Sequence, residues 1–149
     1  MGNITAIKNY FRVTENLGTA GMPLREQFAD IAAAGYQVVI NLASSGSPGQ
    51  LTDEEQLVQS LGMEYTAIPV IWERPQLDDL RRFFSVMDAN QNRRIFVHCV
   101  ANYRVSVFVF LYRTLRLATP PGPAWTDLTR IWTPDGIWSE FINQARSQI

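Results

Sequence analysis

Three short apolar runs, each followed or preceded by a helical pattern, constrain the fold of this chain most strongly. They read YQVVINLA (36–43), MEYTAIPVI (63–71) and RIFVHC (94–99). Runs of this length that alternate with helices are typical of parallel strands joined by crossover helices. The first run is continuously apolar in its middle, as expected for a strand covered on both faces. We therefore predict an α/β fold with a central, mainly parallel sheet and helices on both faces.

The segments before the first and second runs carry signals for helix starts. In residues 23–35, Pro23 is predicted to be the first residue of a helix, because the fixed φ of proline suits that position. In residues 52–62, Thr52 precedes Glu55 by three positions, which predicts a capping box. Both segments are predicted to be helices.

The remaining chain shows three further helical patterns. Residues 75–90 begin with Pro75 and repeat apolar side chains at helical spacing. Residues 104–118 are apolar almost all round, which predicts a central buried helix. A stiff connector at 119–123 then leads to a tail rich in tryptophan, predicted to form two short helices that cap the core.

Length and composition limit the classes of protein. The 149 residues, of which 46% are hydrophobic and 18% charged, fit a single domain over residues 1–149. A net charge of -1 gives no general attraction for nucleic acid or membranes, and no apolar run is long enough to span a bilayer. One cysteine allows no internal disulfide. We expect a cytoplasmic protein with no nucleic-acid or membrane partner and an oligomeric state that the sequence does not define.

The only histidine and the only cysteine stand together at the end of the third run, in HCVANYR. If a strand ends at Cys99 and a helix begins near Arg104, the free amides and the dipole at the helix start favour a bound oxyanion. The same surroundings favour the thiolate, which is the nucleophilic form of cysteine. Arg104 offers a planar fork for two phosphate oxygens. These groups together predict phosphoryl transfer through a cysteinyl-phosphate intermediate.

The stretch VHCVANYR resembles the signature of the cysteine-dependent protein tyrosine and dual-specificity phosphatases. The resemblance extends to a bacterial branch of uncharacterised phosphatase-like proteins, some fused to metallo-β-lactamase-like hydrolases. Further elements of that branch occur in order, namely TAGMP (19–23), VVINLAS (38–44) and a strand ending in IPV (68–70). The match covers roughly residues 11–117. It implies a protein-tyrosine-phosphatase-like fold and a phosphatase that needs no cofactor.

The loop departs from the family pattern in three ways. Four residues, rather than five, separate Cys99 from Arg104. Asn102 replaces the loop glycine, and asparagine is the next most tolerant residue for a left-handed backbone. The hydroxyl residue that follows the arginine in the family, where it helps the thiolate leave, is replaced by Val105, with Ser106 one position later. The resemblance thus implies an oxyanion site more strongly than it implies turnover.

The family's general acid is also absent from its usual place. It is an aspartate on the loop after the third strand, which here reads VIWERPQ (70–76) and holds only Glu73 as a substitute. Asp135 in WTPDG is a second candidate, because low-molecular-weight tyrosine phosphatases take their acid from a region after the cysteine. A turn that opens the last helix explains Asp135 equally well. The third alternative is that the protein supplies no acid.

Two neighbours of Cys99 have other expected roles. In a strand, the His98 side chain points away from that of Cys99, so we predict that His98 orders the loop through hydrogen bonds. Tyr103 either lines the rim of the pocket or packs against the core. One histidine and one cysteine adjacent in a strand cannot both face an ion, so no metal site is predicted.

The predicted site therefore consists of Cys99 as nucleophile, Arg104 as clamp and Glu73 as candidate acid, with His98 and Ser106 in support. The residues expected to hold the substrate phosphate are Val100, Ala101, Asn102, Tyr103 and Arg104. The expected ligands are a phosphorylated protein or small molecule and inorganic phosphate or a similar oxyanion. Two other functions stay open: a rhodanese-like sulfurtransferase, which also places four residues between cysteine and arginine, and a module that binds phosphate without turnover.

Overall fold

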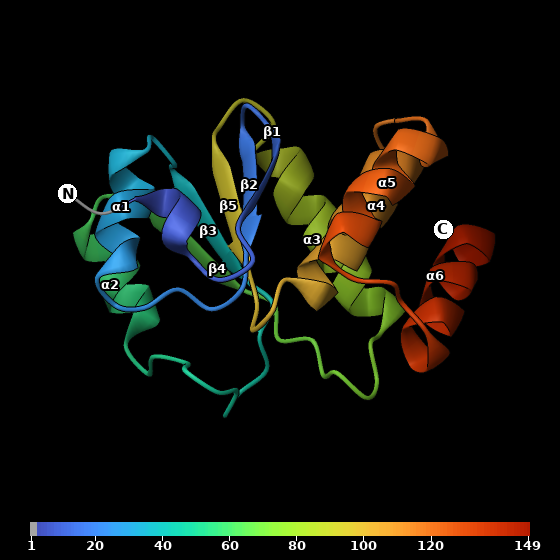
Figure 1. Cartoon of the computed structure of the whole chain (residues 1–149), viewed down its shortest axis with the longest axis horizontal. Helices are drawn as coiled ribbons and strands as arrows, with labels where there is room; N and C mark the ends of the chain where they lie inside the picture. Colours follow the sequence, from blue (N-terminus) through green and yellow to red (C-terminus); the bar gives the residue numbers. More distant parts are fainter. Residues whose placement is uncertain (1–2) are drawn as a thin grey trace.

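A five-stranded sheet crosses the centre of the computed structural model, which describes residues 3–149 (Figure 1). The spatial order is β1-β2-β5-β3-β4, and every neighbouring pair is parallel except the antiparallel hairpin of β1 and β2. The strands are β1 (Phe11–Thr14), β2 (Leu17–Ala20), β3 (Val38–Asn41), β4 (Glu64–Ala67) and β5 (Ile95–His98). The predicted α/β class with a mainly parallel sheet is confirmed.

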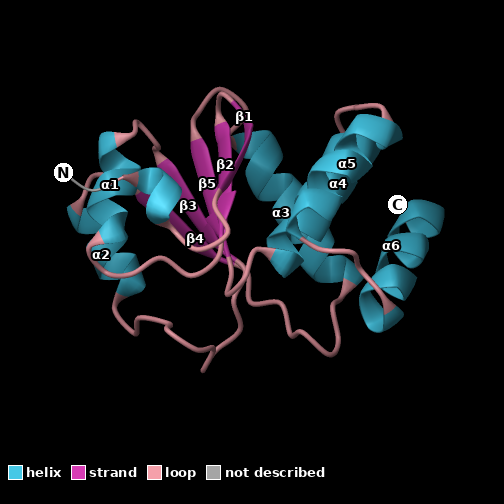
Figure 2. Ribbon diagram, viewed as in Figure 1, coloured by secondary structure: helices cyan, strands magenta, loops and turns pink. Residues whose placement is uncertain are grey.

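Helices cover both faces of this sheet, as Figure 2 shows. One face is covered by α1 (Gln27–Ala33) and α2 (Glu54–Ser60), near the short 3-10 helix η1 (Ile4–Ala6). The other face is covered by α3 (Leu77–Ala89), α4 (Tyr103–Leu115), α5 (Pro121–Ile131) and α6 (Gly136–Gln148). None of the helices within residues 3–149 combines the length and apolar character needed to cross a bilayer.

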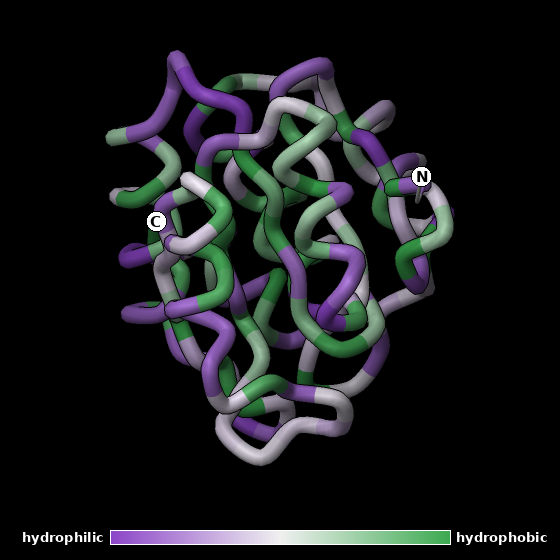
Figure 3. The backbone as a smooth tube through the Cα atoms, turned by 90° about the vertical axis from the view of Figure 1, so that its left-hand side faces the viewer, coloured by the Kyte–Doolittle hydropathy of each residue, from purple (hydrophilic) through white to green (hydrophobic). Residues whose placement is uncertain are grey.

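The central strand β5 divides its side chains between two cores. Ile95 and Val97 belong to the core under α3 to α6, whereas Phe96 packs in the core under α1 and α2. This alternation follows from the period of two in a strand, where successive side chains point to opposite faces. Figure 3 shows hydrophobic segments, in green, in the middle of the molecule and hydrophilic segments, in purple, at many of its outer turns. The first run forms β3, whose four residues are all buried, so the prediction of a strand covered on both faces is confirmed.

The hairpin of β1 and β2 was not predicted. Its second strand has the sequence LGTA, which is short and lacks β-branched alternation. Gly18 in this strand lies against the Tyr36 ring, and an added Cβ would lie 2.4 Å from the Tyr36 hydroxyl oxygen. This strand therefore depends on a close contact with a residue that is distant in the sequence. Such a contact leaves no local sequence pattern from which the strand could be predicted.

Two of the predicted helix starts lie too early in the chain. Pro23 precedes α1 by four residues, because the helix begins at Gln27, whose side chain accepts a hydrogen bond from the Leu24 amide at 2.7 Å. Pro75 precedes α3 by two residues, because Gln76 is still extended. The prolines mark the approach to each helix rather than its first turn.

The predicted capping box of α2 is wrong. The N-cap residue is Asp53, and its side chain makes no capping hydrogen bond. Asp53 instead pairs with Arg25 at 2.6 Å on the surface. The carboxylate of the next residue, Glu54, turns into the protein interior, where it is 2% exposed. The first turn of α2 thus directs one acidic side chain toward the sheet.

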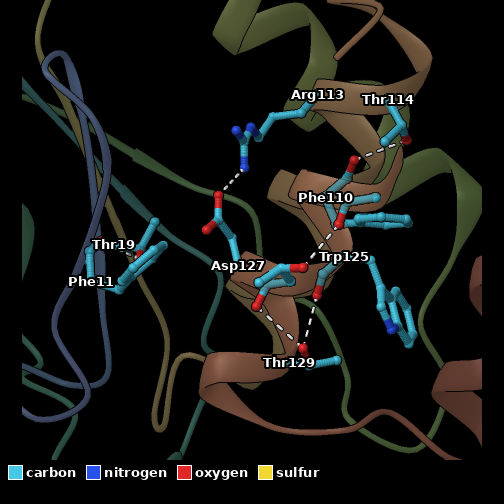
Figure 4. A network of polar contacts seen from close by, with 10 residues as sticks. Phe11, Thr19, Phe110, Arg113, Thr114, Trp125, Asp127 and Thr129 are labelled. Atoms are coloured by element: carbon cyan, nitrogen blue, oxygen red, sulfur yellow. Dashed lines mark hydrogen bonds and ion pairs between the residues drawn. The ribbon is translucent and has the colours of Figure 1, made fainter. Parts of the chain in front are cut away.

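The predicted buried helix and the two helices of the tail are present. Residues 104–112 of α4 are all buried. The connector is shorter than expected, because α5 already begins at Pro121. An ion pair between Arg113 of α4 and Asp127 of α5, at 2.7 Å, joins these helices (Figure 4). Among the tail tryptophans Trp138 is buried in the core, whereas Trp125 is 40% exposed.

We predict that Phe108→Ala lowers the free energy of unfolding by about 3–5 kcal/mol, because it leaves a cavity in the larger core. Phe108 is fully buried and its ring lies 5.7 Å from Phe83 and 5.8 Å from Phe141. Urea denaturation measures the change. Leu24→Ala serves as the control, since Leu24 is 59% exposed, and should change stability by less than about 0.5 kcal/mol. Equal effects of the two substitutions would contradict this description of the core.

Candidate active site

Cys99 directly follows β5 and lines a cavity of about 450 Å³. The cavity lies at the carboxyl ends of the parallel strands, where the loops after β3, β4 and β5 gather at the lower edge of the sheet in Figure 1. Ligands of open α/β folds bind at such edges. The remaining lining residues are Ser44, Ser45, Gly46, Ser47, Pro48, Trp72, Glu73, Val100, Ala101, Tyr103 and Arg104.

The carbonyl groups of the loop after Cys99 are bonded to other segments of the chain. The Val100 carbonyl accepts a hydrogen bond from the Met22 amide at 3.0 Å, and the Ala101 carbonyl accepts one from Asn9 Nδ2 at 2.9 Å. Within residues 3–149, the amides of residues 100–104 donate to no protein group. A run of free amides at a helix start is a binding site for an anion.

Asn102 adopts the left-handed conformation that its position requires. Its φ is 69°, it is fully buried, and it is the N-cap residue of α4. Its Nδ2 donates to the Asn9 carbonyl at 2.9 Å and to Thr19 Oγ1 at 3.0 Å. The Thr19 hydroxyl donates in turn to the Phe11 carbonyl, and both residues are labelled in Figure 4. The side chain thereby ties the loop to the hairpin of β1 and β2.

Arg104 lies in the first turn of α4 and is 5% exposed. Its Nη1 donates to the Val70 carbonyl at 2.8 Å and to Ser44 Oγ at 3.4 Å, so that the loops after β4 and β3 orient the guanidinium. In the described part of the chain, no carboxylate forms an ion pair with it. A buried cation without a counter-charge, in contact with a cavity, favours the binding of an anion.

His98 points to the face of the sheet opposite Cys99. Its ring packs edge-on against Phe28 at 6.0 Å, and its Nε2 lies 2.6 Å from Glu54 Oε2. Its Nδ1 lies 3.3 Å from the Cys99 carbonyl oxygen. Sequence reasoning missed Glu54, because an acidic residue in a first helical turn is explained by the helix dipole alone.

Ser106 does not line the cavity that holds Cys99. Its hydroxyl donates to the Tyr103 carbonyl at 2.8 Å and accepts a hydrogen bond from Trp132 Nε1 at 3.0 Å. Tyr103 stacks on Trp132 with a centroid distance of 4.6 Å and also faces Trp72 at 6.2 Å. The cavity wall on this side is therefore aromatic. Tyr103 takes the first of its two expected places, on the pocket, whereas Trp72 was not expected there.

The two candidate acids lie in different places. Glu73 is exposed and lines the cavity with Cys99. Asp135 is the N-cap residue of α6, and its carbonyl accepts the amides of Trp138 and Ser139. It is not among the residues that line the cavity. Across residues 3–149, no three His, Cys, Asp or Glu side chains are close enough together to hold a metal ion.

No protein-family model matches the chain. The chain is similar to a DUF442 protein from Shewanella putrefaciens CN-32, described as a candidate phosphatase, whose crystal structure superimposes with a TM-score of 0.87. The two are 31% identical, and the match covers 97% of this chain and 95% of that protein. This chain belongs to the DUF442 family. The predicted resemblance is therefore confirmed.

Two other proteins are similar to this DUF442 chain. One is a beta-lactamase hydrolase-like protein of Agrobacterium fabrum, 32% identical over 107 residues and 70% of this chain. The chain spans about a quarter of the length of that protein. The other is TpbA of P. aeruginosa, crystallised in complex with pTyr, which shares the fold with a TM-score of 0.68 at 13% identity. That match covers 99% of this chain and 85% of TpbA.

We predict that Gly21→Ala weakens oxyanion binding, because the added Cβ would lie 2.5 Å from the Val100 carbonyl oxygen and 3.2 Å from Ala101 Cα. Both are backbone atoms, so the loop has to move. The measurement is the rise in melting temperature on adding tungstate, which should shrink in the variant.

The matched control is Gly122→Ala in α5, where an added Cβ would have no neighbour within 4 Å. Alanine is the better helix former by about 0.5–1 kcal/mol, so this variant should be at least as stable as the wild type. Its response to tungstate should be unchanged. An undiminished response in Gly21→Ala would show that the loop does not bind the anion.

Proposed function

We propose that this protein hydrolyses phosphate monoesters with Cys99 as the nucleophile. The observation that carries the proposal is Arg104, a buried cation without a carboxylate partner within residues 3–149, in the same cavity as the cysteine and the free amides. A phosphate group can pair with Arg104, accept hydrogen bonds from the free amides and present its phosphorus to the cysteine. The description of the Shewanella relative as a candidate phosphatase supports the same activity.

The proposed reaction has two steps. In the first, the Cys99 thiolate attacks phosphorus, the S–P bond forms, and the bond from phosphorus to the ester oxygen breaks. Arg104 and the amides of residues 100–104 stabilise the charge on the three equatorial oxygens. In the second step, water attacks phosphorus, the S–P bond breaks, and inorganic phosphate and the thiolate are released. No metal or cofactor takes part.

Glu73 is the proposed general acid. It protonates the leaving oxygen in the first step, and its carboxylate then accepts a proton from the attacking water. Its support is its place on the cavity wall, which Asp135 does not share. An exposed position on the rim suits a group that must reach both the leaving oxygen and water.

Aryl phosphates, including phosphotyrosine, are the proposed substrate class, with dual specificity as an extension. Trp72 and Tyr103 form an aromatic wall beside Cys99, and an aromatic leaving group can pack against it. The pTyr complex of TpbA, a protein of the same fold, is consistent with this assignment.

A phosphate-binding module without turnover is the second candidate function. It is favoured by Ser106, whose hydroxyl is engaged with Tyr103 and Trp132 instead of facing the cavity. A sulfurtransferase that carries a persulfide on Cys99 is the third, favoured by the loop of four residues.

We predict that the protein hydrolyses p-nitrophenyl phosphate and that Cys99→Ser lowers kcat by roughly three orders of magnitude or more. The serine variant keeps the amides and Arg104, so it should still bind tungstate in the thermal-shift measurement. Activity that persists in Cys99→Ser would exclude the proposed nucleophile. Binding without turnover in the wild type would favour the module, and cyanide-dependent conversion of thiosulfate would favour the sulfurtransferase.

Glu73→Gln should slow hydrolysis of an alkyl phosphate by roughly 10²-fold or more, because a poor leaving group needs a proton. Hydrolysis of p-nitrophenyl phosphate should be affected much less. Asp135→Asn is the matched control and should leave both rates unchanged, since Asp135 does not line the cavity. The assignment fails if Glu73→Gln slows both substrates equally or if Asp135→Asn produces the selective loss.

A further inference from the structure

A buried carboxylate behind the cysteine loop has no role in the reaction described above. Glu54 of α2 is 2% exposed and the His98 side chain is fully buried. Their atoms Oε2 and Nε2 are 2.6 Å apart. A buried carboxylate is costly unless it is paired and hydrogen-bonded. In the described residues no lysine or arginine pairs with Glu54, so His98 is its one cationic partner.

The second ring nitrogen of His98 also faces an oxygen. Nδ1 lies 3.3 Å from the carbonyl oxygen of Cys99, the residue on which the proposed chemistry depends. A neutral imidazole carries one N–H and so can donate to only one of these two oxygens, whereas the imidazolium donates to both. The arrangement of acceptors therefore favours the charged ring, with the Glu54 carboxylate as its counter-charge.

The groups around this pair are consistent with a charged carboxylate. Asn41 stands opposite His98 in the register of β3 and β5, and its Nδ2 lies 3.4 Å from Glu54 Oε1. The same Nδ2 donates to the Tyr65 hydroxyl oxygen at 3.2 Å. Burial raises the pKa of Tyr65, so this hydroxyl stays neutral. The exposed Glu55 raises the pKa of Tyr65 as well.

The pair also connects the two loops that border the cavity. Asn41 Oδ1 accepts a hydrogen bond from the Ala43 amide at 2.9 Å, and the His98 carbonyl accepts one from the Leu42 amide at 2.9 Å. These bonds fix the start of the loop after β3, which carries Ser44 to the guanidinium of Arg104. Displacement of His98 would therefore disturb both sides of the site.

We propose that Glu54 is a positioning residue, which holds His98 as an imidazolium and thereby fixes the Cys99 carbonyl and places a positive charge behind the nucleophile. The charge favours the thiolate of Cys99 over the thiol, since a nearby cation stabilises the anionic form. The effect on catalysis rests on the proposed phosphatase function. The charge of the ring and the reactivity of the thiol do not depend on that function.

The chain contains one histidine, so the ring can be observed without assignment. Nitrogen-15 NMR of the side chain at neutral pH should show two protonated ring nitrogens in the wild type. In Glu54→Gln one of the two should lose its proton, because the counter-charge is gone. Glu55→Gln, which removes the neighbouring exposed charge on the same helix, should behave like the wild type. A neutral ring in the wild type, or a charged ring in Glu54→Gln, would overturn the proposal.

The chain also contains one cysteine, so alkylation by iodoacetamide reports on Cys99 alone. At neutral pH we expect alkylation to be about tenfold slower in Glu54→Gln, because the imidazolium next to Cys99 is lost together with the more distant carboxylate, and unchanged in Glu55→Gln. Equal rates in the wild type and both variants would refute the link between Glu54 and the thiol. If Glu54→Gln does not fold, the NMR spectrum of the wild type still decides the charge of the ring. If the protein hydrolyses no phosphate ester, only the proposed function fails.

Discussion

The geometry of the cavity depends on where the carbonyl groups of Val100 and Ala101 are bonded. A short loop can present successive amides to an anion only if its carbonyls are satisfied elsewhere, because a buried carbonyl without a donor is costly. Here the donors come from the first part of the chain, in the Met22 amide and the Asn9 side chain. Asn9 is 92 residues away from Ala101 in sequence and itself has a φ of 50°. The segment before α1 is therefore part of the site, although none of its residues lines the cavity.

The central strand determines which side of the sheet each functional group occupies. Since side chains alternate along β5, Cys99 shares the larger core with α3 to α6, and His98 turns toward α1 and α2. Cys99, the proposed nucleophile, and the Glu54–His98 pair behind it thus lie in separate cores and meet through one backbone carbonyl. Helix α2 can influence the site in this way without contact with substrate.

The sequence allowed the architecture and the main residues of the cavity to be predicted, because their signals are local. The runs that form β3 and β5 are apolar since those strands are buried on both faces, and Asn102 is identifiable from its tolerance of the left-handed conformation. The hairpin and Glu54 were not predictable. Glycine is needed at position 18 because the Tyr36 ring lies against it, and Glu54 is buried because it pairs with His98. Neither contact leaves a periodic pattern in the sequence. Pro23 and Pro75 correctly indicated that helices follow, but the predicted starts lie four and two residues too early.

The position of Ser106 follows from the geometry of α4. An α-helix turns by about 100° per residue, so a side chain two positions after Arg104 points about 200° away from it, to the opposite side of the helix. Arg104 faces the cavity, and Ser106 consequently meets Trp132 between α4 and α5. A hydroxyl displaced by one position therefore cannot take the place of one that directly follows the arginine. The serine hydroxyl that contacts the guanidinium belongs to Ser44, on the loop after β3.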